Sequence, residues 1–279
     1  MERSVERHPD LIEKLDVLLV DADIMVYELA FSAEYTDDEG QRQVRGFEYI
    51  HESVQRFLEY LKIRLDCQSL ELFLTGDGNF RKKVAVTQEY KGKRSVKPFH
   101  YDATRSLLEH VYNAKVVHGM EADDWMSYQQ TVNIQQDINS CIVSRDKDLM
   151  MVEGWHYQWM VGRQPEKLSK ATKLGSLDLG TGKKRKLRGD GLRWFYAQVL
   201  MGDVVDNIPG LQGVGDVAAW NALKDCQTEQ ELFSAVRQMY HDKGKDDAYL
   251  MEQCYLLWMV REINNGVPVM YKPPVYLED

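Results

Sequence analysis

The hydrophobic positions of the chain change their spacing along its length, and this spacing predicts the order of its elements. Apolar runs at 15–21 (LDVLLVD) and 70–76 (LELFLTG) are typical of buried strands. Between them, apolar residues recur at helical spacing, at Ile50, Val54, Phe57, Leu61 and Leu65. Two more strands are predicted at 114–119 and 140–144, separated by a helix at about 122–135. This alternation favours an α/β fold with a mostly parallel central sheet and flanking helices.

The pattern changes after this α/β part. Residues 162–191 are polar, basic and rich in glycine, which predicts a loop. Helical periods then run to near the end, at 192–201, 214–224, 229–241 and 247–262, followed by an extended tail. The sequence therefore predicts an α/β core over 1–161, a basic loop over 162–191 and a helical region over 192–279.

Carboxylates follow the apolar runs directly. The acidic residues at the ends of the four predicted strands are Asp21, Asp23, Asp77, Glu121, Asp123, Asp124, Asp146 and Asp148. One such cluster is typical of a helix N-terminus, where the helix dipole favours negative charge. Four in succession favour a shared site, because parallel strands end at the same edge of a sheet.

So many carboxylates repel one another unless cations neutralise them. Oxygen ligands without histidine or cysteine indicate Mg²⁺, or Mn²⁺, and not zinc. Several carboxylates in one site are typical of enzymes that hold two such ions for phosphoryl chemistry. The sequence contains no nucleotide-binding P-loop, no nucleophile elbow and no zinc-type spacing of histidine or cysteine.

A fifth acidic pair, Asp203 and Asp206, lies three residues apart, so on a helix end both side chains would face the same way. The glycine-rich segment that follows, 209–215, predicts a hairpin whose backbone amides could hold a phosphate before the next helix begins.

Charge is distributed unevenly. The chain has a net charge of −9, which by itself argues against a polyanionic partner. Residues 81–97, however, hold seven Lys or Arg against one Glu, a local excess of 7 − 1 = +6, and residues 183–188 (KKRKLR) are also basic. Each run is either a solvated charged face or a surface for nucleic-acid backbone.

The sequence also indicates the cellular compartment of the protein. The four cysteines are far apart, which favours reduced thiols, and the charged start of the chain lacks the apolar core of a signal peptide. Nowhere do about 18 consecutive apolar residues occur, as a membrane span would need. We therefore expect a cytoplasmic protein without a membrane partner.

The motifs VDAD, FRKK…EYKGKR, GMEADD, SRDKDL and LMGDVVDNIPGLQGVG, in this order from about Leu19 to Gly215, carry a resemblance. The sequence resembles the structure-specific 5′ nucleases, which include flap endonucleases and the 5′→3′ exonucleases of phages and of bacterial DNA polymerase I. The resemblance implies a PIN-like 5′ nuclease fold and two or more Mg²⁺ ions, replaceable by Mn²⁺. The implied metal ligands are Asp21, Asp77, Glu121, Asp123, Asp124, Asp146, Asp148, Asp203 and Asp206.

The resemblance also implies which residues bind DNA. It assigns catalytic positions near the cleaved phosphate to Arg81, Tyr90, Lys91 and Arg94, within a helical arch near 80–100. Further DNA contacts are expected from Lys82, Lys83, Lys93, Lys97, Gly210, Gly213 and Gly215. The three glycines belong to an implied helix–hairpin–helix element near 200–224, which could bind K⁺ as well. The expected substrate is DNA with a 5′ end or 5′ flap, and the expected protein is a monomer of phage or bacterial origin.

Three departures from the family pattern concern substrate grip more than chemistry. Asp23 is an extra acid, Glu28 stands where an arginine is common, and Asp216 and Val217 follow the hairpin where a lysine is common. Two alternatives stay open at this point. A PIN-type ribonuclease would use a similar sheet with fewer carboxylates, and a non-catalytic junction-binding protein would lose the metal ligands.

Overall fold

The computed structural model describes residues 5–91, 96–182 and 185–274. They fall into two compact units. The first, here called the sheet unit, comprises Met1–Gly78, Ser95–Arg145 and Trp155–Ser169. The second, here called the helical unit, comprises Asn79–Arg94, Asp146–Gly154 and Lys170–Asp279. Each unit is described by itself.

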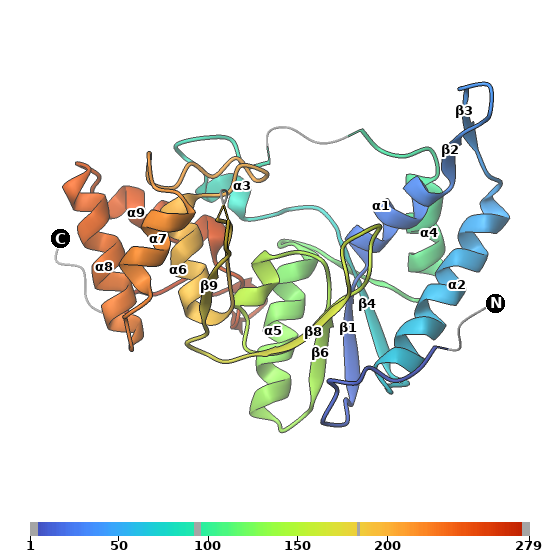
Figure 1. Ribbon diagram of the computed structural model, residues 1–279, viewed down its shortest axis with the longest axis horizontal. Helices are drawn as coiled ribbons and strands as arrows, with labels where there is room; N and C mark the ends of the chain where they lie inside the picture. Colours follow the sequence, from blue (N-terminus) through green and yellow to red (C-terminus); the bar gives the residue numbers. More distant parts are fainter. Residues whose placement is uncertain (1–4, 92–95, 183–184, 275–279) are drawn as a thin grey trace. The chain divides into compact units, whose positions relative to one another are not determined.

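The sheet unit is built around a six-stranded sheet in the order β5-β4-β1-β6-β7-β8 (Figure 1). The strands are β1 (Val17–Asp21), β4 (Leu70–Thr75), β5 (Lys115–Val117), β6 (Ser140–Val143), β7 (Gly154–Gln158) and β8 (Lys167–Ala171). The pairs β1·β4, β1·β6, β4·β5 and β6·β7 are parallel. The predicted fold class, an α/β fold with a mostly parallel sheet, is therefore confirmed.

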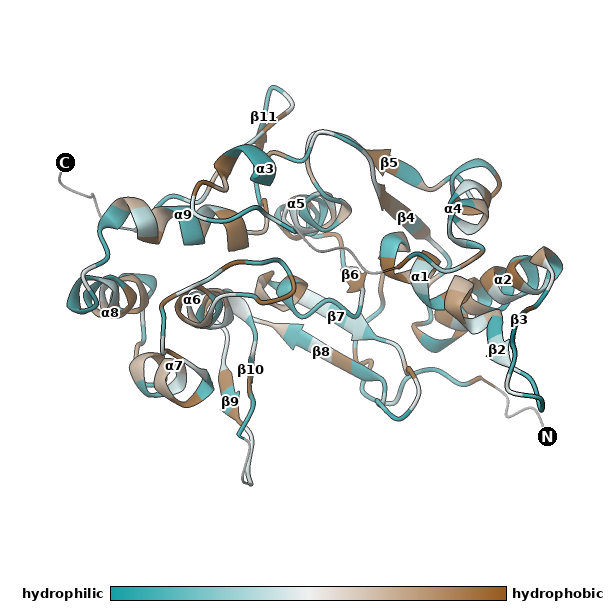
Figure 2. Ribbon diagram, turned by 90° about the horizontal axis from the view of Figure 1, so that it is seen from above, coloured by the Kyte–Doolittle hydropathy of each residue, from teal (hydrophilic) through white to brown (hydrophobic). Residues whose placement is uncertain are grey.

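Helices cover both faces of this sheet. In Figure 2, α1 (Ala22–Ser32), α2 (Phe47–Arg64) and α4 (Tyr101–His110) lie on one side, and α5 (Ala122–Gln135) lies on the other. A small hairpin, β2 (Glu34–Thr36) and β3 (Arg42–Val44), connects α1 to α2. Leu18, Val20, Val54, Leu61 and Leu74 are among the residues of the buried core. Because both faces are covered, β1 and β6 are buried along almost their whole length and are mostly apolar, as the sequence pattern indicated.

The segment 162–191, expected to be a loop, contains three strands. One of them, β8, forms an edge of the central sheet, and β9 (Leu177–Leu179) pairs with β10 (Leu187–Gly189) in a separate antiparallel ribbon. The expectation of a loop was wrong for these residues. The sequence of β8, KLSKA, exposes two lysines and buries only Leu168 and Ala171, as an edge strand does and a fully buried strand does not.

The helical unit contains α3 (Arg81–Val84), the 3₁₀ helix η1 (Asp148–Met151), α6 (Gly191–Met201), α7 (Asp216–Leu223), α8 (Glu229–Asp242) and α9 (Asp247–Leu257). Two short strands, β11 (Ile263–Asn264) and β12 (Val267–Pro268), follow. Nine of the eleven residues of α6 are buried, so this helix forms the centre of the unit's core. Throughout the described ranges, no helix combines the length and apolar character needed to cross a membrane.

The last helix, α9, is shorter than predicted because its end serves another contact. It was expected to reach residue 262, but Trp258 has an extended backbone. The Arg81 side chain donates from Nε to the Leu256 carbonyl at 2.8 Å and from Nη2 to the Trp258 carbonyl at 2.6 Å. Satisfying these terminal carbonyls stabilises the end of the helix at this position.

Candidate metal-binding and nucleic-acid-binding residues

In the sheet unit, parallel pairing brings the carboxyl ends of β1, β4, β5 and β6 to one edge of the sheet. Asp21 is the last residue of β1 and also caps α1, since its Oδ1 accepts from the Ile24 N–H at 3.1 Å. Its Oδ2 accepts from the Ser144 hydroxyl at 2.7 Å. The side chain is 5% exposed, and burial, with the neighbouring Asp23, raises its pKa to about 6. A nearby cation would stabilise its ionised form.

The extra acid Asp23 has structural contacts. Its Oδ2 accepts from the Thr75 N–H at 2.8 Å, and its Oδ1 pairs with Arg105 at 3.2 Å. Arg105 also donates to the Thr75 carbonyl at 2.6 Å. Asp23 therefore ties α1 to the end of β4 and to α4, which accounts for an acid at this position without a metal.

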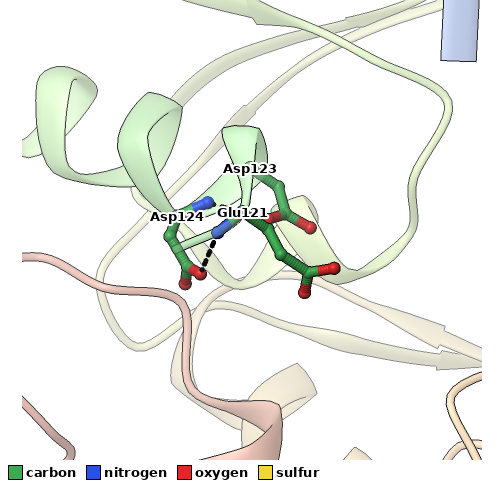
Figure 3. A group of neighbouring side chains, drawn as sticks. All are labelled: Glu121, Asp123 and Asp124. Carbon is green, nitrogen blue, oxygen red and sulfur yellow. Dashed lines mark hydrogen bonds between the residues drawn. The ribbon is translucent and has the colours of Figure 1, made fainter. Parts of the chain in front are cut away.

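Three carboxylates gather at the start of α5. One oxygen from each of Glu121, Asp123 and Asp124 lies within 4.8 Å of the other two (Figure 3). The Glu121 N–H donates to Asp124 Oδ2 at 3.2 Å, as part of a capping box, and Thr75 Oγ1 accepts from the Ala122 N–H at 2.9 Å. The helix start and the end of β4 thus fix the cluster in place. Glu121 and Asp124 are buried, with 8% and 0% exposure.

Asp77, the acid that follows β4, is placed differently. Its side chain is 90% exposed, and it is hydrogen-bonded to Nδ1 of His118. This hydrogen bond lowers the pKa of Asp77. The structure keeps Asp77 ionised by pairing it with a histidine that the sequence analysis did not single out.

The helical unit holds a second acidic group, together with a lysine. Lys147 Nζ lies 3.1 Å from Asp148 Oδ1 and also contacts Asp203 Oδ2. Asp148 and Asp203 are 6% and 4% exposed, and the Asp148 N–H donates to Asp146 Oδ1 at 2.8 Å. Burial opposes the charge of Lys147, but Asp148 and Asp203 outweigh it and raise its pKa. The lysine therefore neutralises part of this acidic group.

The three-residue spacing of Asp203 and Asp206 suggested a helix end, but both residues belong to a turn. Residues 204–207 form the turn, and a backbone bridge between Asp203 and Ile208 closes it. Asp203 Oδ1 accepts from the N–H groups of Val205 and Asp206, at 2.8 and 3.4 Å. The spacing was misleading because a side chain that bonds nearby amides competes with the helix.

Tyr90 and Lys91 also contact this turn. The Tyr90 hydroxyl donates to Asp206 Oδ2 at 3.1 Å, and Lys91 Nζ lies 3.7 Å from Asp206 Oδ1. Tyr90 is only 5% exposed, so its ring is buried in this conformation, and its expected position near the cleaved phosphate stays a prediction. Lys91 has φ 51°, a backbone region that non-glycine residues rarely adopt, and its N–H donates to the Asp206 carbonyl at 3.0 Å.

The predicted basic residues fall into three groups. Arg81 is 1% exposed and binds the carbonyls at the end of α9, so it stabilises packing and does not offer its guanidinium to a phosphate, contrary to its expected catalytic role. Lys82, Lys83 and Lys97 are exposed. Lys93 and Arg94 lie outside the described residues, as do Lys183 and Lys184 of the second basic run.

The glycine-rich segment connects α6 to α7, and its glycines differ. The Gly210 N–H donates to Gln253 Oε1 at 3.1 Å, and a Cβ at Gly210 would lie 2.2 Å from the Gly202 nitrogen, so this glycine serves close packing and its amide is occupied. Gly213 has φ +80° with open space around it. Gly215 caps α7 with an ordinary extended backbone, φ −120°. Gly210, with φ +59°, and Gly213 therefore both adopt a backbone conformation that favours glycine, whereas Gly215 does not.

Two of the departures from the family pattern also have partners. The Asp216 side chain accepts from the Leu187 N–H at 2.6 Å, which joins the start of α7 to β10. Glu28 accepts from the Trp159 indole N–H at 2.6 Å, and burial raises its pKa. Glu28 lines a largely apolar cavity of about 360 Å³ between α1, α2 and Trp159. Both acids are therefore held by structure in their own unit.

Sequence reasoning missed the residues that position the carboxylates, which include Thr75, His118, Ser144 and Lys147. Thr75 and Ser144 lie at or just after the end of a strand, so a hydroxyl between an apolar run and an acid was a usable signal. Lys147 stands between two predicted metal ligands, and this alternation of charge was also visible in the sequence.

Comparison with known proteins supports the fold. No protein-family model matches the chain. It is similar to the T5 5′-exonuclease with bound zinc ions, at 13% identity and a TM-score of 0.54, over 87% of this chain and 89% of that one. It is also similar to the catalytic core of Rad2 in complex with a DNA substrate, at 16% identity and a TM-score of 0.50, over 94% of this chain and 84% of the other. The resemblance to 5′ nucleases is thus confirmed at the level of the fold.

Proposed function

We propose that this chain is a divalent-metal-dependent 5′ nuclease that hydrolyses phosphodiester bonds of DNA near junctions between single strands and duplex. The observation that carries the proposal is the convergence of Glu121, Asp123 and Asp124, with ligand oxygens within 4.8 Å, at the carboxyl edge of a parallel sheet. Its fold is shared with a 5′-exonuclease that binds divalent metal ions.

The donor set fits Mg²⁺ or Mn²⁺. All three ligands of the sheet-unit cluster are carboxylates, and hard divalent ions prefer oxygen ligands, whereas zinc sites usually include nitrogen or sulfur. Glu121 and Asp124 are almost fully buried, and buried carboxylates held this close together are costly without a cation. We propose Asp21 and Asp77 as further ligands in this unit, and Asp146, Asp148, Asp203 and Asp206 as the ligand set of the helical unit.

Bound metal ions would supply a water of lowered pKa as nucleophile and would stabilise the leaving 3′ oxygen. The chain's own residues prepare for this chemistry. Ser144 and the Ile24 amide hold the Asp21 carboxylate, and Tyr90 holds that of Asp206. Lys91 brings a positive charge that can neutralise the phosphate as the bond breaks, and we propose the same role for Arg94.

We propose DNA with a 5′ end or 5′ flap as the substrate, and a 5′ phosphate on the product. The exposed Lys82, Lys83 and Lys97 can contact backbone phosphates, and Lys93 is proposed to join them. At the start of α7, a Cβ at Gly213 or Gly215 would meet open space, so a ligand can approach the backbone there. We propose that backbone amides of this segment bind duplex phosphates, with K⁺ as a bridging ion. The similarity to a Rad2 core bound to DNA supports a DNA substrate.

One assay tests the proposal. The protein is incubated with Mg²⁺ and end-labelled 5′-flap, nicked, blunt-duplex or single-stranded DNA, and the cleavage positions and end groups are mapped. We expect cuts at or near the junction, products with 5′ phosphates and no cleavage in EDTA. Absence of metal-dependent cleavage on every substrate, with a native circular dichroism spectrum, would overturn the proposal.

The two alternatives predict other outcomes of the same assay. A PIN-type ribonuclease would cut single-stranded RNA faster than a DNA flap in single-turnover reactions. A non-catalytic junction-binding protein would bind flap DNA in a gel-shift experiment without cutting it. The Glu121, Asp123 and Asp124 cluster favours catalysis over the junction-binding alternative, because binding alone needs no buried group of carboxylates.

A further inference from the structure

The turn between Asp203 and Asp206 presents two valines to solvent. Val204 is 95% exposed and Val205 is 79% exposed, which places them among the most exposed large apolar residues of the described chain. A single exposed valine needs no explanation. Two in succession, at the tip of a turn flanked on both sides by proposed metal ligands, indicate a surface that meets something apolar.

The valines do not serve the turn itself. Tight turns favour Gly, Pro, Asn, Asp and Ser, whereas β-branched side chains restrict the backbone and favour strands. Here other residues of the turn stabilise its backbone conformation. Asp203 accepts the Val205 N–H, and Asn207 adopts the left-handed conformation with φ 59°. Val204 and Val205 could be polar at no cost to this geometry, so their side chains point to an external contact.

The turn is also held rigidly. Asp203 and Ile208 exchange two backbone hydrogen bonds, at 2.8 and 2.7 Å. The Asn207 side chain donates to the Glu89 carbonyl at 2.9 Å, and the Lys91 N–H donates to the Asp206 carbonyl at 3.0 Å. A ligand that meets the two valines therefore meets a surface that is already ordered and loses little entropy on binding.

The charged residues next to the two valines indicate which kind of ligand would contact them. Asp203 and Asp206 lie directly beside them in the chain, and Lys91 contacts Asp206. When the phosphate of a nucleotide is bound through these acids and this lysine, the base of that nucleotide lies close to the two valines. The base has an apolar face, whereas its phosphate would be repelled by the carboxylates without a metal. Of the parts of a nucleic acid, the base is the one that matches two methyl-bearing side chains.

We propose that Val204 and Val205 form a contact surface for the nucleobase beside the cleaved phosphodiester. This inference rests on the proposed function, since it takes Asp203 and Asp206 as metal ligands. Apolar contact with the face of a base does not depend on which base is present, because every base has such a face. The two valines then position the end of the cut strand without reading its sequence.

The test combines a protein change with a substrate change. Affinity in Ca²⁺ and single-turnover cleavage in Mg²⁺ are measured for the wild type and for Val204→Ser/Val205→Ser. The substrates are 5′-flap DNA, intact or with one abasic nucleotide at each of the three positions on either side of the cut. At one position or more, we expect base removal to weaken wild-type binding about 3- to 10-fold, as for a few apolar carbon contacts, and to have no further effect on the variant.

Val267→Ser is the matched control, because Val267 is a valine of the same unit that is 63% exposed and belongs to β12 and not to the turn. It should behave as the wild type. The proposal is overturned if base removal weakens the variant as much as the wild type, or if the wild type is indifferent to base removal at every position. Failure of the proposed function would appear separately, as absence of metal-dependent cleavage of intact DNA by the wild type, while the binding comparison still decides the role of the valines.

Discussion

The two acidic groups of the protein are neutralised in different ways. In the sheet unit, Glu121, Asp123 and Asp124 are set by the backbone of a helix start, with Asp124 accepting the Glu121 N–H. In the helical unit, Asp148 and Asp203 are held by the ammonium group of Lys147, and Asp206 is paired with Lys91. One group relies on helix geometry, and the other includes positive side chains.

This difference has consequences for metal binding. A helix N-terminus contributes about half a positive charge, which partly offsets three carboxylates and leaves them strongly attractive to a divalent ion. Lysines beside buried carboxylates supply whole charges, and a metal ion must compete with them. We therefore expect the sheet-unit cluster to bind metal more tightly than the helical-unit group. The lysines in turn hold the helical-unit carboxylates in place before any ion binds.

Removing one carboxylate from either group should have the largest effect. Asp123→Asn and Asp148→Asn should each slow single-turnover cleavage of flap DNA at least about 100-fold, since loss of a ligand should exceed the 10- to 100-fold effect of changing a ligand's partner. DNA binding without metal should hold or rise. Asp146→Asn should behave in the same way. The exposed Asp38 provides the control, and Asp38→Asn should cleave normally. Near-normal turnover in the Asp148 and Asp146 variants would remove the helical-unit acids from the metal site.

Lys91→Ala should have the next largest effect. The basic stretch 81–97 implies about 4 to 6 phosphate contacts, so log affinity for flap DNA should fall with log salt at a slope of roughly −3.5 to −5.5. Losing Lys91 should make this slope shallower by about one unit and slow cleavage about 10-fold. Arg94→Ala is predicted to act similarly. Binding titrations over a range of salt concentrations measure the slope, and a slope near zero for the wild type would show that the basic run is only a solvated face.

Lys147→Met tests the competition between lysine and metal. Without metal, this change leaves two buried carboxylates, Asp148 and Asp203, without their ammonium partner. The melting temperature in EDTA should fall by about 2 to 4 °C for each kcal/mol lost. Mg²⁺ should restore it, with a larger thermal shift than in the wild type. An equal shift in both proteins would mean that no ion enters the helical-unit group.

A carboxylate with a purely structural role gives the smallest effect on cleavage. Glu166 in the sheet unit accepts hydrogen bonds from Arg64, Tyr157 and Tyr60, and the bond from Arg64 is the main cause that lowers its pKa to about 2. Because the folded-state pKa lies below the usual 4.5, its contribution to stability is present above about pH 4.5 and is lost as the pH falls towards 2.

Glu166→Gln should therefore lower the free energy of unfolding at neutral pH by about 1 to 3 kcal/mol and leave metal-dependent cleavage unchanged. Urea unfolding at pH 7 and pH 2.5 measures the first effect, and the difference between variant and wild type should shrink at the lower pH. If Glu166→Gln slowed cleavage as much as Asp148→Asn, the assignment of Glu166 as a purely structural carboxylate would be wrong.

Much of the fold was predictable because its signals are local. The strands β1, β4 and β6 are mostly apolar runs, and the helix at 122–135 was predicted with the bounds that the structure gives. Parallel order then follows from the alternation of strands and helices. The edge strand β8 was missed, because its charged residues face solvent and imitate a loop.

The sequence alone determined the candidate metal ligands, because carboxylates that follow buried strands are visible in the sequence and parallel strands end at the same edge of a sheet. It could not determine how side chains far apart in the chain are used. Arg81 and Tyr90 looked like DNA contacts, yet Arg81 is held by the carbonyls after α9 and Tyr90 by Asp206. Only the tertiary structure decides whether a charged or polar group binds a partner within the protein or can bind a ligand. The reason is that a buried group must form its hydrogen bonds with the groups that packing places beside it.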